Sequence, residues 1–126
     1  MADATYSAGR DRLITGDWTA DTIQVLLITG SYTYSAAHSN ITDISGEATG
    51  TGYERKAVPT RTVSAGKLDH GDITWTGLDT GTLAAAVYFD SSDGQLLFFK
   101  DSGFPLDTNG SDVILATGAN GLVQLS

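Results

Sequence analysis

The 126-residue sequence contains no cysteine, only two prolines and one methionine, and seven basic residues against fifteen acidic ones. Without cysteine the chain has neither disulfide bonds nor thiolate metal ligands, and a reducing compartment is compatible with it. The formal net charge of −8 repels phosphate backbones and anionic membrane surfaces. We therefore expect a protein that binds neither nucleic acid nor membranes.

Long hydrophobic runs are also missing, because the longest apolar runs have the length of single strands. The first residues, MADATYSAGRDR, include no apolar stretch of signal-peptide length, so we expect a soluble protein that is not exported by that route. A chain of 126 residues is long enough to bury a core without disulfides or metals. The expectation is a single domain over residues 1–126.

What the sequence does contain is glycine, fifteen residues in all, together with many Thr, Ser and Asp residues between the apolar runs. The strongest signal is LAAAVYFDSSDGQLLFFK at residues 83–100, which predicts a β-hairpin whose turn contains Gly94. Alternation along the first strand separates two faces, one with Leu83, Ala85, Val87 and Phe89 and the other with Ala84, Ala86 and Tyr88. Both faces are apolar or small, so we expect layers packed on both sides of this hairpin.

The remaining pattern predicts a mainly β protein, an antiparallel β-sandwich or barrel of six to eight short strands with one short N-terminal helix. The helix is expected over residues 6–16, inside an N-terminal arm of residues 1–20, and Trp18 is expected to close one end of the core. Residues 63–70 are interpreted as a turn-rich link, and residues 30–52 as a long connection with a single helical turn within residues 36–44. Further strands are expected at residues 22–29, at 53–62, at 71–76, and at 113–116 and 122–125 as a final hairpin. Pro59 within residues 53–62 indicates an edge strand or a strand end.

Residues able to carry catalysis are few. Only His38 and His70 are available as imidazole bases, and no serine lies in a G-x-S-x-G sequence. His70 lies between Asp69 and Asp72, which could form a metal or acid–base cluster, although such a polar link is ordinarily a turn. We therefore predict no catalytic residue, no metal site, no cofactor and no enzymatic activity.

The acidic loops DSSDG and DTNGSD have oxygen ligands at close spacing, as calcium-binding loops do. Neither has the terminal glutamate of the twelve-residue calcium-binding pattern. The favoured interpretation is that Asp and Asn stabilise the turns through side-chain to backbone hydrogen bonds, with a bound cation as the alternative.

The candidates for partner binding are Tyr32 and Tyr34 in the long connection, and the basic residues Arg55, Lys56 and Arg61. The basic residues form a local group on an acidic protein. They are interpreted either as a solvated edge or as a contact to an acidic neighbour, where complementary charge would set orientation and rate.

Four segments occur in the order found in a family of small phage virion proteins, those of the capsid decoration, cement or head auxiliary type. They are YSAGRDRLITGDWTADTIQVLLIT, TGTGYERKAV, GDITWT followed by LAAAVYFD, and LLFFKDSGFPLDTNGSDVILATGANGLVQLS. The shared patterns are D-W-x-x-D-x-I-x-V-x-L after the start, T-G-x-G-Y in the middle and D-T-N-G-x-D before the last strands. The chain resembles this family over nearly its whole length, through the order of motifs that are individually unspecific.

The resemblance implies a virion protein that acts by binding. The leading hypothesis is a capsid decoration protein, made in the host cytoplasm and bound to the outer surface of the shell of major capsid protein, where it stabilises the head. We expect a homo-oligomer, most plausibly a trimer, with residues 1–20 and 30–52 as contact elements because their internal packing is low. One alternative is a tail or head-fibre component that binds a host glycan through exposed Tyr32 and Tyr34. Another is an enzyme, which would need His38 or His70 beside a carboxylate in a pocket.

Overall fold

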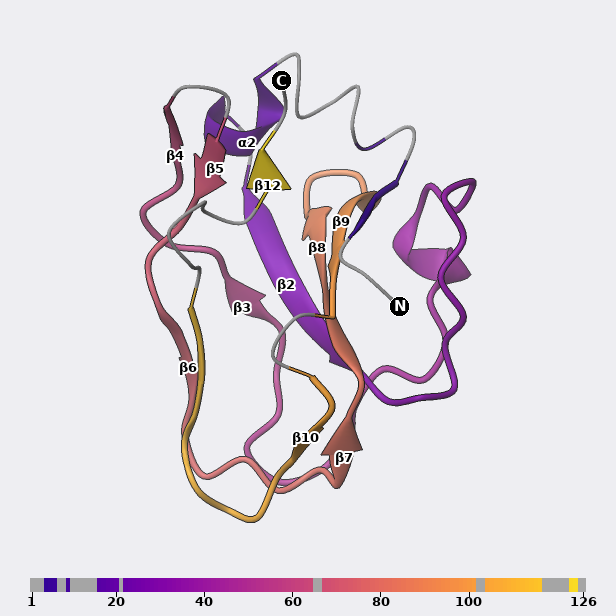
Figure 1. The fold of residues 1–126 in the computed structure, drawn as a ribbon, viewed down its shortest axis with the longest axis vertical. Coiled ribbons are helices and arrows are strands. Elements are labelled where there is room, and N and C mark those ends of the chain that lie inside the picture. The colour runs from indigo at the N-terminus through magenta and orange to yellow at the C-terminus, as the bar shows by residue number, and fades with distance from the viewer. Residues whose placement is uncertain are drawn as a thin grey trace.

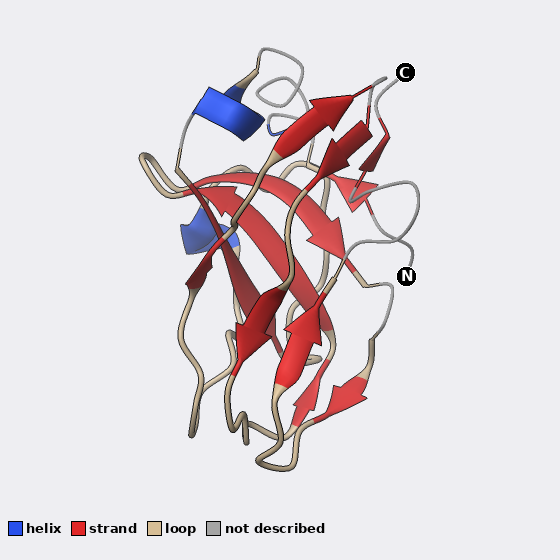
Figure 2. Ribbon diagram, turned by 90° about the vertical axis from the view of Figure 1, so that its left-hand side faces the viewer, coloured by secondary structure: helices blue, strands red, loops and turns tan. Residues whose placement is uncertain are grey.

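The computed structural model describes residues 4–6, 9, 16–20, 22–64, 67–101, 104–116 and 123–124. It is mainly β, with antiparallel pairing in every sheet (Figures 1 and 2). The largest sheet has five strands. In spatial order they are β1 (Ala4–Thr5), β9 (Gln95–Lys100), β8 (Ala85–Asp90), β2 (Ile23–Ile28) and β3 (Lys56–Ala57). The predicted fold class, a mainly β protein with antiparallel sheets, is confirmed.

Three smaller sheets contain the other strands. They are the pair β6 (Ile73–Trp75) and β11 (Val113–Leu115), the pair β7 (Thr82–Leu83) and β10 (Leu106–Asp107), and the triplet β4 (Thr62–Ser64), β5 (Lys67–Asp69) and β12 (Val123–Gln124). Figure 2 shows short strands in front of the long, twisted strands of the five-stranded sheet. Together these strands make the layered arrangement that the two apolar faces of the hairpin predict.

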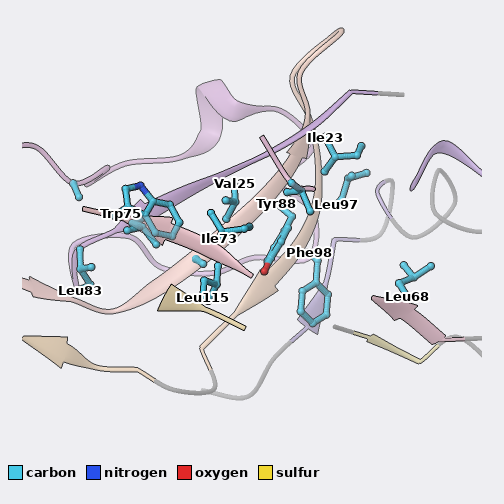
Figure 3. Close-up of a cluster of buried hydrophobic side chains, with 14 of the residues drawn as sticks. Ile23, Val25, Leu68, Ile73, Trp75, Leu83, Tyr88, Leu97, Phe98 and Leu115 are labelled. Atoms are coloured by element: carbon cyan, nitrogen blue, oxygen red, sulfur yellow. The ribbon is translucent and has the colours of Figure 1, made fainter. Parts of the chain in front are cut away.

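Strands β8 and β9 form the predicted hairpin, and Gly94 in its turn has a positive φ of 79°. Side chains alternate between two buried clusters, as a strand requires. Ala86 and Tyr88 belong to the cluster shared with the smaller sheets, which we call the inner cluster (Figure 3). Residues 85, 87 and 89 belong to an outer cluster on the opposite face. All six residues of β8 are buried, so the prediction that both faces are covered is confirmed.

Two details of the hairpin differ from simple alternation. Leu83 was expected on the face of Val87 but lies in the inner cluster, because β7 ends at Leu83 and β8 starts only at Ala85. In β9 a bulge leaves Leu97 without a pairing residue in β8, since Tyr88 pairs with Phe98 and the next residue of β8 pairs with residue 96. The bulge brings two successive residues, 97 and 98, into the inner cluster.

Several other predictions are confirmed. Strand β2 lies within residues 22–29, β3 forms the edge of the five-stranded sheet, and β6 buries Ile73 and Trp75 while Thr74 is exposed. Trp18 is fully buried in the inner cluster. The helical turn expected within residues 36–44 is a 3₁₀ helix at Ile41–Asp43, with Asn40 as its N-cap.

Two strand assignments were wrong. Residues 63–70 do not form a turn-rich link, because β4 and β5 pair there as antiparallel strands. The last two strands do not pair with each other: β11 pairs with β6, and β12 pairs with β5. These pairings join segments that are far apart in the sequence, so alternation within each strand could not reveal them.

The helix expected over residues 6–16 falls mainly on residues 7–8 and 10–15, which lie outside the described residues. The helices of the described ranges are short: α2 (Asp17–Ala20) and the 3₁₀ helix at Ile41–Asp43. No helix among the described residues has the length and apolar character needed to cross a membrane.

Candidate binding surface

The first part of residues 30–52 packs on the outer face of the five-stranded sheet through Tyr32, Tyr34, Ile41 and Ile44, while Ala48 belongs to the inner cluster. Tyr32 is 8% exposed, and its hydroxyl lies 2.9 Å from that of the buried Tyr6. The hydroxyl of Tyr34 donates to the carbonyl oxygen of Thr5 in β1. Both rings pack on Phe99, with centroid distances of 6.1 Å for Tyr32 and 5.2 Å for Tyr34. The two predicted contact tyrosines thus fasten their own segment to the sheet.

The middle of the same segment is attached to the turn between β8 and β9. The amide of Ile41 donates to the carbonyl of Gly94 at 2.9 Å, and the amide of Leu96 donates to the carbonyl of Ser39 at 2.9 Å. The Asn40 side chain donates to the carbonyl of Asp93 at 3.0 Å. A side chain at Gly94 would meet Asn40 and Ile41 at 3.1–3.2 Å, so the absence of a β-carbon permits this close approach. Two separate attachments therefore fix the segment.

The expectation that residues 30–52 have low internal packing is wrong for their inner side, where Tyr32 and Ala48 are buried. Their outer side is exposed and consists of small or polar residues. These are Ser31, Thr33, Ala36, Ala37, Ser39, Thr42, Asp43 and Ser45. A fixed segment with an exposed polar outer side is a surface whose shape is set before any partner arrives.

Arg55, one of the predicted basic residues, binds a carboxylate of its own chain. Its Nε and Nη2 donate to the two oxygens of Glu47 at 2.9 and 2.7 Å, and its guanidinium lies 5.4 Å from the centre of the Phe89 ring. The Tyr53 hydroxyl donates to the same carboxylate. Burial by itself would raise the pKa of Glu47, but the hydrogen bonds from Arg55 and Tyr53 and the charge of Arg55 outweigh it and lower that pKa.

The other two basic residues also have neighbours within the chain. Lys56 Nζ lies 2.8 Å from Glu54 Oε1, and Arg61 Nη1 donates to the carbonyl of Val58 at 3.1 Å. Both Arg55 and Lys56 keep part of their side chains exposed, 39% and 28% respectively. The acidic neighbours suggested by the sequence therefore include residues of this chain, while a role of these side chains in partner binding stays a prediction.

The two histidines lie in different surroundings. His70 is 6% exposed, and its Nδ1 lies 2.6 Å from the carbonyl of Gly71 while its Nε2 lies 2.7 Å from the Tyr88 hydroxyl. Since a carbonyl can only accept, Nδ1 carries the proton and Nε2 accepts from Tyr88. Burial lowers the pKa of His70, with Lys100 adding to this effect and the hydrogen bond to Gly71 and the charges of residues 69 and 72 opposing it.

His38 is half-buried in the long segment, and its Nδ1 lies 2.8 Å from the Tyr32 hydroxyl. The hydroxyls of Tyr6 and Tyr32 and the His38 ring therefore form one continuous chain of hydrogen bonds. The histidines and tyrosines thus form hydrogen bonds that hold buried side chains and the segment in place.

The two acidic loops use their oxygens within their own turns. Asp90 Oδ1 accepts from the amide and hydroxyl of Ser92 at 2.9 and 2.6 Å, and Asn109 Oδ1 accepts from the amide of Ser111 at 3.1 Å. Across the described ranges, no group of three or more His, Asp or Glu side chains lies close enough to hold a metal ion. The geometry of both loops is that of side-chain-stabilised turns.

Two hollows lie on either side of Phe104. One, of about 270 Å³, has a wall of β11 residues and includes Ile114, which is 61% exposed. The other, of about 570 Å³, lies between the start of the long segment and residues 101, 104 and 105, and its lining includes the predicted residues Tyr32 and Tyr34. Phe99 is buried in the hairpin, as the sequence predicts, and Phe104 is partly buried against the inner cluster.

No protein-family model matches the chain, and neither a curated protein nor a solved structure matches it.

Proposed function

We propose that the protein is a bacteriophage capsid decoration protein, which binds the outer surface of the shell of major capsid protein and stabilises the head. The order of its sequence motifs supports this proposal, and so does its mainly β architecture with antiparallel sheets. It acts by binding and needs no catalytic group.

The observation that carries the proposal is the attachment of residues 30–52 at two places. Hydrogen bonds from Tyr34 to β1 and from Asn40 to the turn before β9 hold a polar surface in one arrangement. A surface that is already ordered loses little conformational entropy when it meets a partner. Modest affinity per contact then suffices, because many copies on one shell, and several subunits in a trimer, add their contacts.

The test is the copy number of the chain in purified, intact particles of the parent phage, combined with a density map of the particle. We expect many copies at equivalent positions on the head, and particles lacking the chain should release DNA at lower temperature. Absence from the particle, or a few copies at one vertex or on the tail, would contradict the proposal. The second of these results would instead favour the tail or fibre alternative.

The surface is tested separately with Ala36→Arg, because Ala36 is exposed on the outer side of the segment. The variant should fold normally and bind shells that lack the chain more weakly than the unmodified protein does. Thr76→Arg is the matched control, since Thr76 is also exposed but lies just after β6, outside the five-stranded sheet. Equal binding by both variants would show that residues 30–52 are not the contact.

A further inference from the structure

Thr60 has a strained backbone conformation in the connection between β3 and β4 (Figure 1). Its φ is 49°, and in the part of the chain that the structure describes it is the one residue other than glycine with a positive φ. A side chain branched at the β-carbon is especially unfavourable in this left-handed region, which glycine and asparagine enter more easily. The chain therefore gives up stability by having threonine at this position.

The contacts around Thr60 explain the bend in the backbone but not the side chain. The amide of Val58 donates to the carbonyl of Ile23 in β2 at 2.9 Å. The amide of Gly71 donates to the carbonyl of Pro59 at 2.9 Å. The chain turns between these bonds and the pairing of β4 with β5, because it leaves the five-stranded sheet there and enters a smaller one. All these bonds join backbone groups, so a glycine at position 60 would leave them intact.

The side chains near Thr60 form an exposed and uncharged surface, which we call the β3–β4 surface. Its exposed residues are Ala57, Pro59, Thr60, Thr62 and Val63. Val63 is 53% exposed, and among the large apolar residues of the described ranges only Ile114 is exposed as well. Strained residues persist where function requires them, and exposed apolar side chains are typical of surfaces that bind other proteins. The two features together indicate a protein contact.

The distribution of charge indicates which protein this surface meets. Residues 47–67 contain four basic and two acidic residues, a net charge of +2, whereas the rest of the chain contains three basic and thirteen acidic residues, a net charge of −10. This count includes the carboxylates that pair with Arg55 and Lys56, so the positive charge remains after those pairs have formed. A second copy of the chain is therefore repelled by most of the molecule and attracted by this part of it.

We propose that the β3–β4 surface binds a second copy of the chain, which presents an acidic part of its own surface. Thr60 and Val63 form the centre of the contact, and the positive charge around them orients the approaching copy. Because the two contacting surfaces differ, the contact is head-to-tail and closes into a ring when the rotation between copies permits it. The proposal concerns contacts between copies, so it does not depend on binding to a capsid shell.

The first test compares Thr60→Gly and Thr60→Asn with the unmodified full chain. Both variants should raise the folding equilibrium constant about threefold or more in urea unfolding at low protein concentration, because they relieve the strain. Both should weaken self-association about fivefold or more in analytical ultracentrifugation, because the threonine side chain is lost from the contact. Unchanged self-association of both variants would overturn the role of Thr60, and unchanged stability would contradict the strain. An unmodified chain that sediments as a monomer at every concentration would overturn the proposal as a whole.

The second test adds one carboxylate at each of the two exposed apolar residues. Val63→Asp should weaken self-association about tenfold or more, because it brings a negative charge to the surface that meets an acidic partner. Ile114→Asp is the matched control on β11 and should weaken self-association less than about twofold. Circular dichroism checks that both variants are folded. Equal effects of the two variants would contradict the location of the contact.

Salt and shell binding then distinguish the partner. Self-association should weaken about threefold or more when the NaCl concentration rises from about 0.05 M to about 0.5 M, since salt screens the attraction between the two surfaces. Self-association that does not depend on salt would contradict an acidic surface as the partner. If the Thr60 variants associate normally but bind shells less well than the unmodified chain, the proposal is overturned and this surface belongs to the contact with the shell.

Discussion

The hydrogen bond between Tyr88 and His70 gives the sharpest prediction about stability. Tyr88 is fully buried in β8, and its hydroxyl donates to Nε2 of His70 over 2.7 Å. Trp18 lies beside both rings, at centroid distances of 6.3 Å from His70 and 6.2 Å from Tyr88. The substitution Tyr88→Phe removes the donor and keeps the ring, so the packing of the inner cluster is preserved.

The expected loss follows from leaving Nε2 of a buried imidazole without its donor. Such a group forfeits its hydrogen bond without regaining water, which costs about 1–3 kcal/mol of unfolding free energy. The size of the ring hardly changes, so no cavity adds to this figure. A double variant, Tyr88→Phe with His70→Leu, removes both polar partners and should lose less than the sum of the two single variants.

The same site predicts how stability changes with pH. The pKa of His70 is lowered from its ordinary 6.5 in the folded chain, mainly because of burial. Below pH 6.5 the unfolded chain therefore binds a proton that the folded chain does not. Stability is fully present above this value and is lost as the pH falls from 6.5 toward the folded pKa, with a slope of at most about 1.4 kcal/mol per pH unit from this one group.

Urea unfolding at pH 7.5 and at lower pH values measures both effects. His70→Gln is the matched variant, because its amide oxygen can accept from Tyr88 while the side chain does not titrate. It should reduce the loss of stability between pH 6.5 and 5. A change of less than about 0.5 kcal/mol for Tyr88→Phe, or an unchanged pH dependence in His70→Gln, would refute the reasoning.

Two further predictions concern the inner cluster and the edge of the large sheet. Phe98 is 2% exposed in the inner cluster, so Phe98→Ala should leave a cavity and lower the unfolding free energy by about 3–5 kcal/mol in the same urea assay. Ile114 is 61% exposed, so the control Ile114→Ala should lower it by less than about 0.5 kcal/mol. A folded Phe98→Ala variant of unchanged stability would contradict the assignment of this hairpin to the core. Glu47→Gln should cost about 1 kcal/mol or less at pH 7, since the pair with Arg55 is partly exposed. Because the pKa of Glu47 is lowered from 4.5, its contribution is lost as the pH falls below that value, so the variant should lose less stability than the parent chain between pH 5 and about 3. An identical acid profile in the two proteins would show that this carboxylate is not a stabilising group.

The sequence was informative where a structural signal is local. The hairpin of β8 and β9 could be predicted because alternation is visible within each strand and Gly94 marks the turn. Pro59, which cannot donate to a neighbouring strand, indicated an edge strand or a strand end, and β3 is an edge strand that ends at Ala57, two residues before it. The pairing of β12 with β5 could not be predicted, because the two strands are far apart in the sequence and the pattern within each strand does not specify its partner.

The binding surface was predictable only in part. The sequence singled out Tyr32 and Tyr34 as aromatic residues in a polar segment, but not their attachment to Tyr6 and β1. That attachment follows from the packing of residues 32–44 on the outer face of the large sheet. The pocket beside them is lined by Asp101, Phe104 and Pro105 as well as by the start of this segment, a proximity that no local pattern encodes.

Sequence alone was enough to predict β2, β6 and the hairpin of β8 and β9, the turn at Gly94 and the acidic charge, since each depends on neighbouring residues or on composition. The break at Ala84, the bulge at Leu97 and the covering of the outer face by residues 32–44 depend on the tertiary structure. These features arise because strands that are far apart in the sequence must pair in a register that lets their side chains pack in one core. The physical reason is that alternation acts over a few residues, whereas packing is a property of the whole folded chain.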